Sequence, residues 1–238
     1  MKSRRLSLVA VAVIGGAALV MVVANTPGVA ADQHANQQQG ASGDQQNSGD
    51  ARVQIGLDAA PVPLNVEGKN RALVGLGSYY VNVVGDCNGC HSAGPQTEYL
   101  PGNNPYLRGQ TAEINPATYL GGGRDFGQVF GQGPHIISRN LTPDKTGMRE
   151  GGHTFDEFRQ IIRTGVDLDN LHPNCNGMNG PNCFNPPVDG SKLQIMPWPT
   201  LSKLSDNDLL AIYTYLSTIP CLSPTTDPNN VLFNDCGP

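Results

Sequence analysis

The sequence predicts a helical, loop-rich fold with a modest hydrophobic core, and three observations support this prediction. Three segments carry apolar residues at helical spacing, and no segment shows the strong alternation of a β-strand. Glycine and proline are abundant, at 29 and 19 of 238 residues. Aromatic residues make up only 6% of the chain, which argues against a large sandwich or barrel.

The first predicted helix covers residues 71–87. Leu73, Leu76 and Tyr80 recur at helical spacing, although Gly75 and Gly77 lower the helix propensity. About 65 residues rich in Gly, Pro and Asn follow before the next helix, and a loop that long usually wraps something or has a function.

Two further helices are predicted from the signals at their ends. Each segment begins at a residue that can cap a helix N-terminus and ends at a residue that stops a helix. They are 153–165, with the capping pair Thr154 and Glu157 and the C-cap Gly165, and 205–220, with Ser205, Asp208 and Pro220.

The N-terminus predicts an export signal. Lys2, Arg4 and Arg5 precede an uncharged, mostly apolar run over 6–24, and small residues near position 30 suit cleavage. Residues 1–31 are therefore a cleaved signal peptide or an uncleaved membrane anchor. Residues 32–65 are predicted to be a disordered polar linker, because 32–50 lack Leu, Ile, Val and aromatic residues.

The segment 85–94, GDCNGCHSAG, carries the pattern Cys87-x-x-Cys90-His91, which is typical of covalent c-type haem attachment. Two thiols at this spacing can add to the two vinyl groups of one porphyrin. His91 then supplies a nitrogen ligand to the iron. Because the pattern occurs once, we expect one covalently attached haem c.

Two other uses of this cysteine pair have less support. A zinc ribbon needs a second close pair of cysteines, and the remaining four are widely spaced. A thioredoxin-like redox pair needs a βαβ context that the sequence lacks.

Met196 is the predicted second axial ligand of the iron. It stands before Pro197 and near Pro199, and these prolines stiffen the backbone that would hold a thioether. His172 is the chief rival. The other candidates are Met148, Met178, His135 and His153.

The four remaining cysteines are an even number, as expected in an oxidising compartment. They permit three connectivities, and we favour the local pairs Cys175–Cys183 and Cys221–Cys236. The second pair would pin the C-terminal tail, residues 223–238. Candidates for contact with the haem propionates are Arg124, Arg139 and Trp198.

Four segments together resemble class I monohaem cytochromes c over about residues 70–220. They are GSYYVNVVGDCNGCH (77–91), SRNLTPDKTG (138–147), HTFDEFRQIIRTGVD (153–167) and MPWPTLSKLSDNDLLAIYTYLSTIP (196–220). The set is similar to the cytochrome c subunits and domains of membrane-associated alcohol and gluconate dehydrogenases. The resemblance implies an all-α class I cytochrome c fold in a domain over 66–222.

The resulting hypothesis is an exported single-haem cytochrome that carries single electrons between redox proteins, without catalytic residues of its own. The alternative is a fixed electron-transfer subunit of a dehydrogenase or oxidase complex. A third hypothesis is a haem sensor or haem enzyme. We expect a dehydrogenase, an oxidase or another cytochrome as the partner, in the periplasm or on the outer face of the cytoplasmic membrane. Nucleic acid is not an expected partner, because the formal net charge is −5.

Overall fold

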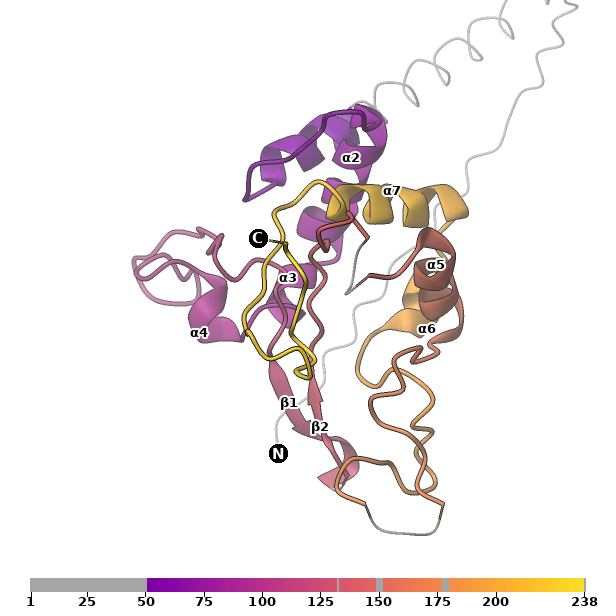
Figure 1. The fold of residues 1–238 in the computed structure, drawn as a ribbon. Helices are drawn as coiled ribbons and strands as arrows, with labels where there is room; N and C mark the ends of the chain where they lie inside the picture. Colours follow the sequence, from indigo (N-terminus) through magenta and orange to yellow (C-terminus); the bar gives the residue numbers. More distant parts are fainter. Residues whose placement is uncertain (1–50, 132, 149–151, 177–179, 238) are drawn as a thin grey trace, which may run out of the picture. The chain divides into compact units, whose positions relative to one another are not determined.

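The first and last long helices, α2 (Arg71–Ser78) and α7 (Asp206–Leu216), pack against each other (Figure 1). The structure is a computed structural model, and it describes residues 51–131, 133–148, 152–176 and 180–237. Both helices contribute buried apolar residues to one core cluster, including Val74, Leu209 and Leu216. This helix pair forms one wall of the hydrophobic core.

Helix α2 begins where the sequence predicts, but its last turns are wider than those of an α-helix. The Asn70 side chain accepts hydrogen bonds from the backbone N–H groups of Ala72 and Leu73 and caps the helix. The chain then continues as a π-helix over Tyr79–Val84. Such wide turns are rare and occur frequently at functional sites.

The capping signals of the other two predicted helices are confirmed. Thr154 and Glu157 form a reciprocal capping box at the start of α5 (Phe155–Thr164), and Ser205 and Asp208 form one before α7. The other helical elements after residue 84 are shorter. They are α3 (Cys87–Cys90), α4 (Pro95–Glu98), a 3₁₀ turn (Val129–Gly131) and α6 (Trp198–Leu201).

The expectation of an all-α fold is wrong in one respect, because the structure contains a small antiparallel sheet. Strand β1 (Asp125–Gln128) pairs with β2 (His135–Ile137), with an irregularity in the register between Asp125 and Gln128. Four and three residues are too few to produce a recognisable alternation of polar and apolar side chains. The described fold is otherwise mainly helical in its regular elements.

The predicted disordered linker, 32–65, ends too late. Residues 51–59 are helical, and the segment after them packs on the core through Val62 and Leu64. The helix can fit closely against α2 because Gly56 has no side chain. A Cβ at this position would lie 2.0 Å from the carbonyl oxygen of Gly75. The polar composition of residues 32–50 does not extend into this apolar stretch, so the folded domain begins before residue 66.

The predicted signal or anchor, 1–31, and the linker residues 32–50 lie outside the described residues. Within the described ranges, none of the helices has the length and apolar character needed to cross a membrane.

Gly77 lies where α2 comes closest to α7. A Cβ on Gly77 would lie 2.0 Å from the carbonyl oxygen of Ala211, which is far inside van der Waals contact. We expect Gly77→Ala to force the helices apart and to lower the free energy of unfolding by about 2–3 kcal/mol, as overpacked cores do. Urea unfolding monitored by circular dichroism measures the change.

Gly121→Ala is the matched control, because the nearest atom to its added Cβ would be 3.5 Å away, an ordinary contact. Equal stability of Gly77→Ala and Gly121→Ala would contradict the close packing of α2 on α7.

Candidate haem site

The four predicted haem residues, Cys87, Cys90, His91 and Met196, all line one cavity of about 240 Å³. Most of its other walls are apolar side chains contributed by the core helices and by the loops between them. Examples are Val81, Leu141, Phe158, Ile162, Leu209 and Leu216. Residues from both ends of the domain therefore meet at one apolar site.

A single helical turn, α3, places the cysteines and His91. Asp86 adopts a left-handed conformation with φ of 43° just before the turn, and the N–H of His91 donates to the Cys87 carbonyl at 2.8 Å. Residues three apart in a helical turn lie on the same side, which suits two thiols that share one ligand. The Asp86 carboxylate lies close to Gly89: a Cβ on Gly89 would be 2.7 Å from one of its oxygens, so that side chain would have to move.

The His91 ring is buried and held through Nδ1. This nitrogen lies 2.8 Å from the backbone carbonyl oxygen of Arg139, so Nδ1 carries the proton and donates. Burial lowers the pKa of His91, against a smaller opposing effect of that hydrogen bond. The ring is therefore neutral at neutral pH, and Nε2 is the nitrogen that can bind iron.

The two cysteines of the motif are the only thiols among the six cysteines, since the other four are paired. Burial raises the pKa of Cys87 to about 12, and the nearby Asp86 and Cys90 add to the shift. Cys90 is exposed. A thioether has no proton to lose, so covalent attachment would remove the titration of the buried sulfur.

The backbone around Met196 has an unusual conformation, and local hydrogen bonds hold it. Ile195 has a φ of 69°, an uncommon conformation for a β-branched residue. The Met196 N–H donates to the Gln194 carbonyl at 2.7 Å, and the Trp198 N–H donates to the Met196 carbonyl at 2.8 Å. Such strain persists only where the surroundings impose it, and it is concentrated at ligand sites.

Of the other candidate ligands within the described ranges, only His172 lies at the cavity wall. Its Nδ1 is buried and has no hydrogen-bond partner among the residues that the structure describes, and its ring stands edge-on to Phe184 at 5.8 Å. His135, His153 and Met148 do not line the cavity. Met178 lies outside the described residues.

Only one of the three candidates for contact with the haem propionates lies at the cavity wall. Arg139 lines the cavity, whereas Arg124 and Trp198 do not. Arg124 donates to the Gly89 carbonyl and lies over the Phe126 ring, and the Trp198 indole donates to the Leu193 carbonyl at 3.3 Å. Both groups therefore support the loops around the cavity.

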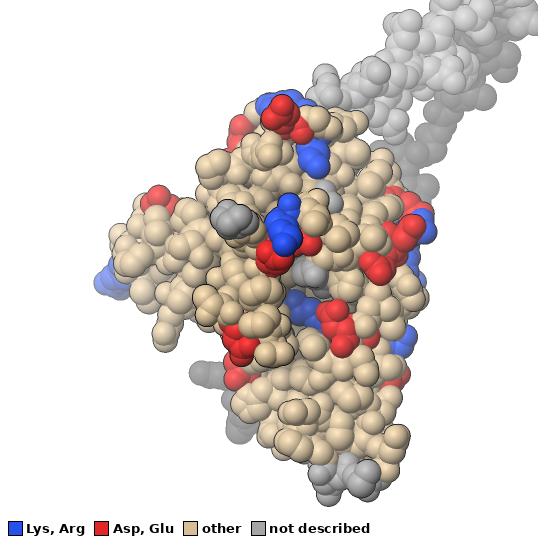
Figure 2. All heavy atoms as spheres, viewed as in Figure 1, with Lys and Arg blue, Asp and Glu red and all other residues tan. Residues whose placement is uncertain are grey.

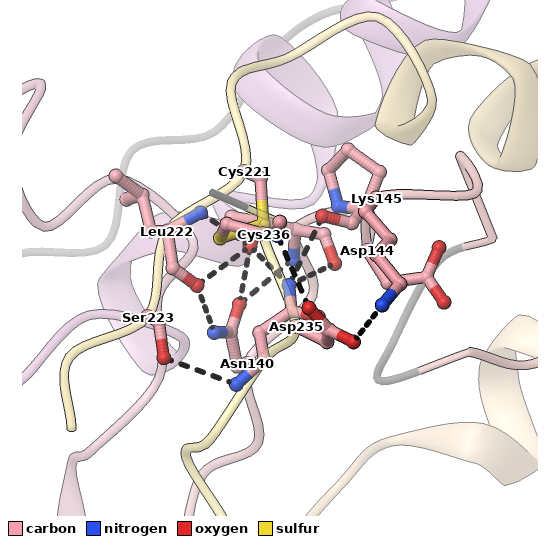
Figure 3. The surroundings of a disulfide bond; sticks show 12 residues. Asn140, Asp144, Lys145, Cys221, Leu222, Ser223, Asp235 and Cys236 are labelled. Atoms are coloured by element: carbon pink, nitrogen blue, oxygen red, sulfur yellow. Dashed lines mark hydrogen bonds and ion pairs between the residues drawn. A yellow bond between two sulfur atoms is a disulfide. The ribbon is translucent and has the colours of Figure 1, made fainter. Parts of the chain in front are cut away.

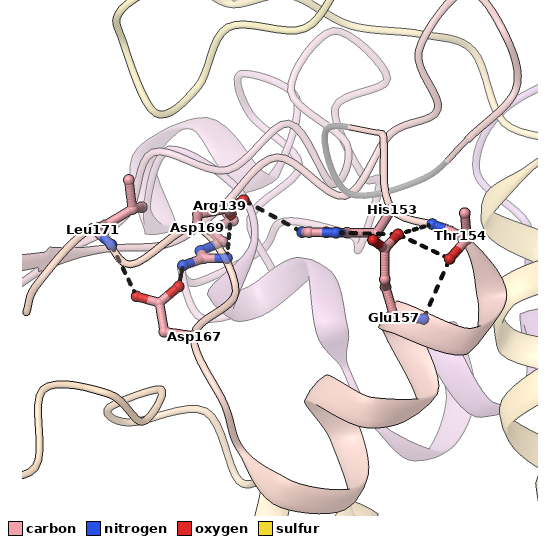
Figure 4. Close-up of polar contacts among 7 residues, drawn as sticks. All are labelled: Arg139, His153, Thr154, Glu157, Asp167, Asp169 and Leu171. Atoms are coloured by element: carbon pink, nitrogen blue, oxygen red, sulfur yellow. Dashed lines mark hydrogen bonds and ion pairs between the residues drawn. The ribbon is translucent and has the colours of Figure 1, made fainter.

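A charged cluster that the sequence does not reveal surrounds Arg139 (Figure 4). Its guanidinium pairs with Asp167 and, at 2.6 Å, with Asp169. Asp169 also faces His153, whose Nε2 lies 3.5 Å from the carboxylate. Asp167 and Asp169 follow Gly165, the C-cap of α5. Their place in the sequence does not predict which residue they would pair with.

Both predicted disulfides are present. Cys175 pairs with Cys183, and Cys221 pairs with Cys236. The first bridge closes a loop whose neighbours His172 and Phe184 line the cavity. Each bridge therefore fastens a segment that has little regular structure of its own.

The pKa of Asp169 gives a testable pH dependence. The hydrogen bond from His153 lowers this pKa below its ordinary value of 3.8, burial opposes the shift, and the charge of Arg139 adds to it. The folded state therefore binds the proton less readily than the unfolded state. The stabilisation is present above pH 3.8 and is lost as the pH falls through the lower, folded-state pKa.

We expect Asp169→Asn to be less stable than the wild type at about pH 7, with a gap that narrows at about pH 3. Urea unfolding at the two pH values measures the gap, and the exposed carboxylate Glu113, changed to Gln, is the control. An equal gap at both pH values would contradict the lowered pKa.

No family model and no solved structure matches the chain. Three curated proteins do. The gluconate 2-dehydrogenase cytochrome c subunit of Pantoea cypripedii is 30% identical over 148 residues, which are 61% of this chain and 23% of that protein. The cytochrome c subunits of the quinone alcohol dehydrogenases of Gluconacetobacter polyoxogenes and Komagataeibacter europaeus are 29% identical over 161 residues, 66% of this chain and 25% of each.

The chain thus spans about a quarter of the length of the relatives it matches. The donor set of the cavity, two thiols, an imidazole and a thioether within apolar walls, has the chemistry that haem c requires. The chain is similar to the cytochrome c subunits of gluconate and alcohol dehydrogenases, and this similarity implies a cytochrome c fold and haem c.

Proposed function

We propose that this protein carries one covalently attached haem c and transfers single electrons as a non-catalytic subunit of a dehydrogenase complex. The observation that carries the proposal is the meeting of Cys87, Cys90, His91 and Met196 on one apolar cavity. The similarity to cytochrome c subunits supports the same function.

Each residue has a separate task in this proposal. Cys87 and Cys90 would hold the haem through thioethers, and His91 and Met196 would supply the nitrogen and sulfur ligands of its iron. The haem supplies reversible one-electron chemistry at iron. The apolar walls exclude water, and a thioether ligand favours the reduced iron and raises the reduction potential. With both axial positions filled by protein, no substrate site remains at the metal.

The mouth of the cavity offers a place for electrons to enter and leave. Val84 and Ile195 line the cavity, yet they are 61% and 49% exposed. We call these two residues the cavity rim. Exposed aliphatic side chains on the same cavity as the exposed Cys90 form an apolar surface that suits a protein partner.

The apolar character of the cavity rim favours a fixed subunit of a complex over a freely diffusing electron carrier. On the face shown in Figure 2, acidic and basic side chains are interspersed without a large area of one sign. Docking by long-range charge alone therefore has little support on this face, and short-range apolar contact has more. The relatives are also named as subunits.

We place the protein in an oxidising compartment, the periplasm or the outer face of the cytoplasmic membrane. The two disulfides support this placement, because disulfides persist in such compartments. The basic and apolar N-terminal segment would direct export.

Visible spectra of the purified protein test the haem site. We expect a low-spin reduced spectrum that CO does not change, because both axial positions are filled. The oxidised protein should show the weak far-red sulfur-to-iron band. Met196→Ala should remove that band and admit CO, whereas His172→Ala should leave both features unchanged. The mass of the denatured chain shows whether one haem remains attached.

If His172→Ala admitted CO while Met196→Ala left the spectrum unchanged, His172 and not Met196 would be the second ligand of the iron. A wild-type protein that is high-spin and binds CO would contradict electron carriage and favour a haem sensor or haem enzyme.

Val84→Asp tests the proposed docking surface. A charge on the rim must be desolvated against an apolar partner, so we expect the second-order rate of reduction by the dehydrogenase from the source organism to fall about tenfold, or about 1.4 kcal/mol. Stopped-flow spectroscopy measures this rate, after the spectrum of the variant has been shown to match the wild type.

Tyr106→Asp is the matched control, since Tyr106 is 80% exposed but does not line the cavity. Equal rates for both variants would show that the rim is not the docking surface. Failure of the wild type to co-purify with the dehydrogenase would favour a free shuttle.

A further inference from the structure

The Cys221–Cys236 disulfide closes residues 221–236 into a loop, here called the tail loop, which packs on the segment 140–145 (Figure 3). Asn140 is at the centre of this contact and is buried. Its side-chain N–H groups donate to the carbonyls of Leu222 and Leu232 at 2.7 and 3.3 Å. The tail loop thus satisfies the donor of a buried amide.

Further contacts join the same two segments. The side chain of Asn234, also buried, donates to the carbonyls of Thr142 and Pro143 at 3.1 and 3.0 Å. Lys145 forms an ion pair with Asp235 at 2.6 Å. The contacts are spread along the segment, so the tail loop holds its backbone at several points.

The fastened segment begins next to the carbonyl that holds His91. The Arg139 carbonyl, which accepts from His91 Nδ1 at 2.8 Å, belongs to the peptide unit that leads into Asn140. Gly122 packs closely against the same peptide, because a Cβ on Gly122 would lie 2.5 Å from the Arg139 carbonyl carbon. The Gly122 N–H in turn donates to the His91 carbonyl at 2.8 Å.

We propose that the tail loop positions the Arg139 carbonyl against His91 and thereby sets the strength of the axial nitrogen ligand. Asn140 is the positioning residue that connects the tail loop to this carbonyl. The inference rests on the proposed haem site and adds a determinant of its reduction potential.

The direction of the effect follows from the hydrogen bond. A carbonyl held close to Nδ1–H makes the imidazole a more basic ligand. A more basic ligand stabilises oxidised iron more than reduced iron and so lowers the reduction potential. A released tail loop would loosen the hydrogen bond and raise the potential.

The test uses the full-length, haem-loaded protein in two variants. Cys221→Ser with Cys236→Ser opens the tail loop without adding charge, and Asn140→Ala removes its central contact while the disulfide stays. We expect both to raise the reduction potential and to speed hydrogen exchange at His91 Nδ1, measured by redox titration and NMR. If the double cysteine variant does not fold, Asn140→Ala by itself is sufficient for the test.

Two controls separate positioning from simple destabilisation. Asn70→Ala removes the cap of α2 and lowers stability elsewhere, and Asn229→Ala alters an exposed part of the tail loop. Neither should change the potential or the exchange. The inference is overturned if both test variants keep the haem attached and show an unchanged reduction potential and unchanged hydrogen exchange at His91 Nδ1. The proposed function would survive that result. A wild-type protein without attached haem overturns the proposed function as well.

Discussion

The hydrogen bond between His91 Nδ1 and the Arg139 carbonyl is the contact on which the site depends. It joins the motif on α3 to a segment almost fifty residues later, across the cavity wall. The segment is held on several sides: the Arg139 side chain by Asp167 and Asp169, the backbone by Gly122, and the neighbouring Asn140 by the tail loop. A neutral imidazole with one defined tautomer is the result.

Around this contact, the chain builds a cavity with few regular elements. The π-helix Tyr79–Val84, together with α5 and α7, provides apolar walls of the cavity, and α2 packs on α7 outside it. Loops complete the remainder, and such loops bury too little apolar surface to hold one conformation by packing alone. Two disulfides and several side-chain amides supply the missing constraint. The structure therefore combines a helical core with a covalently fastened shell.

The sequence predicted the features that depend on neighbours along the chain. The helix caps at Thr154 and Ser205 and both local disulfides are confirmed. The four haem residues line one cavity, as their proposed roles require, while the roles themselves await experiment. The pairing of β1 with β2 and the partners of Arg139 were not predictable, because they join residues distant in sequence through short segments without a periodic pattern. The folded start at residue 51 was missed because a polar stretch precedes it directly.

The exposure of Cys90 and of the rim has a consequence for how electron transfer could be limited. With the proposed haem attached there, its edge would meet a partner at the protein surface, so an electron would have little polypeptide to tunnel through. The speed of transfer would then be decided by how closely two surfaces approach. Changes deep in the core would alter the energy of the electron and leave its path the same.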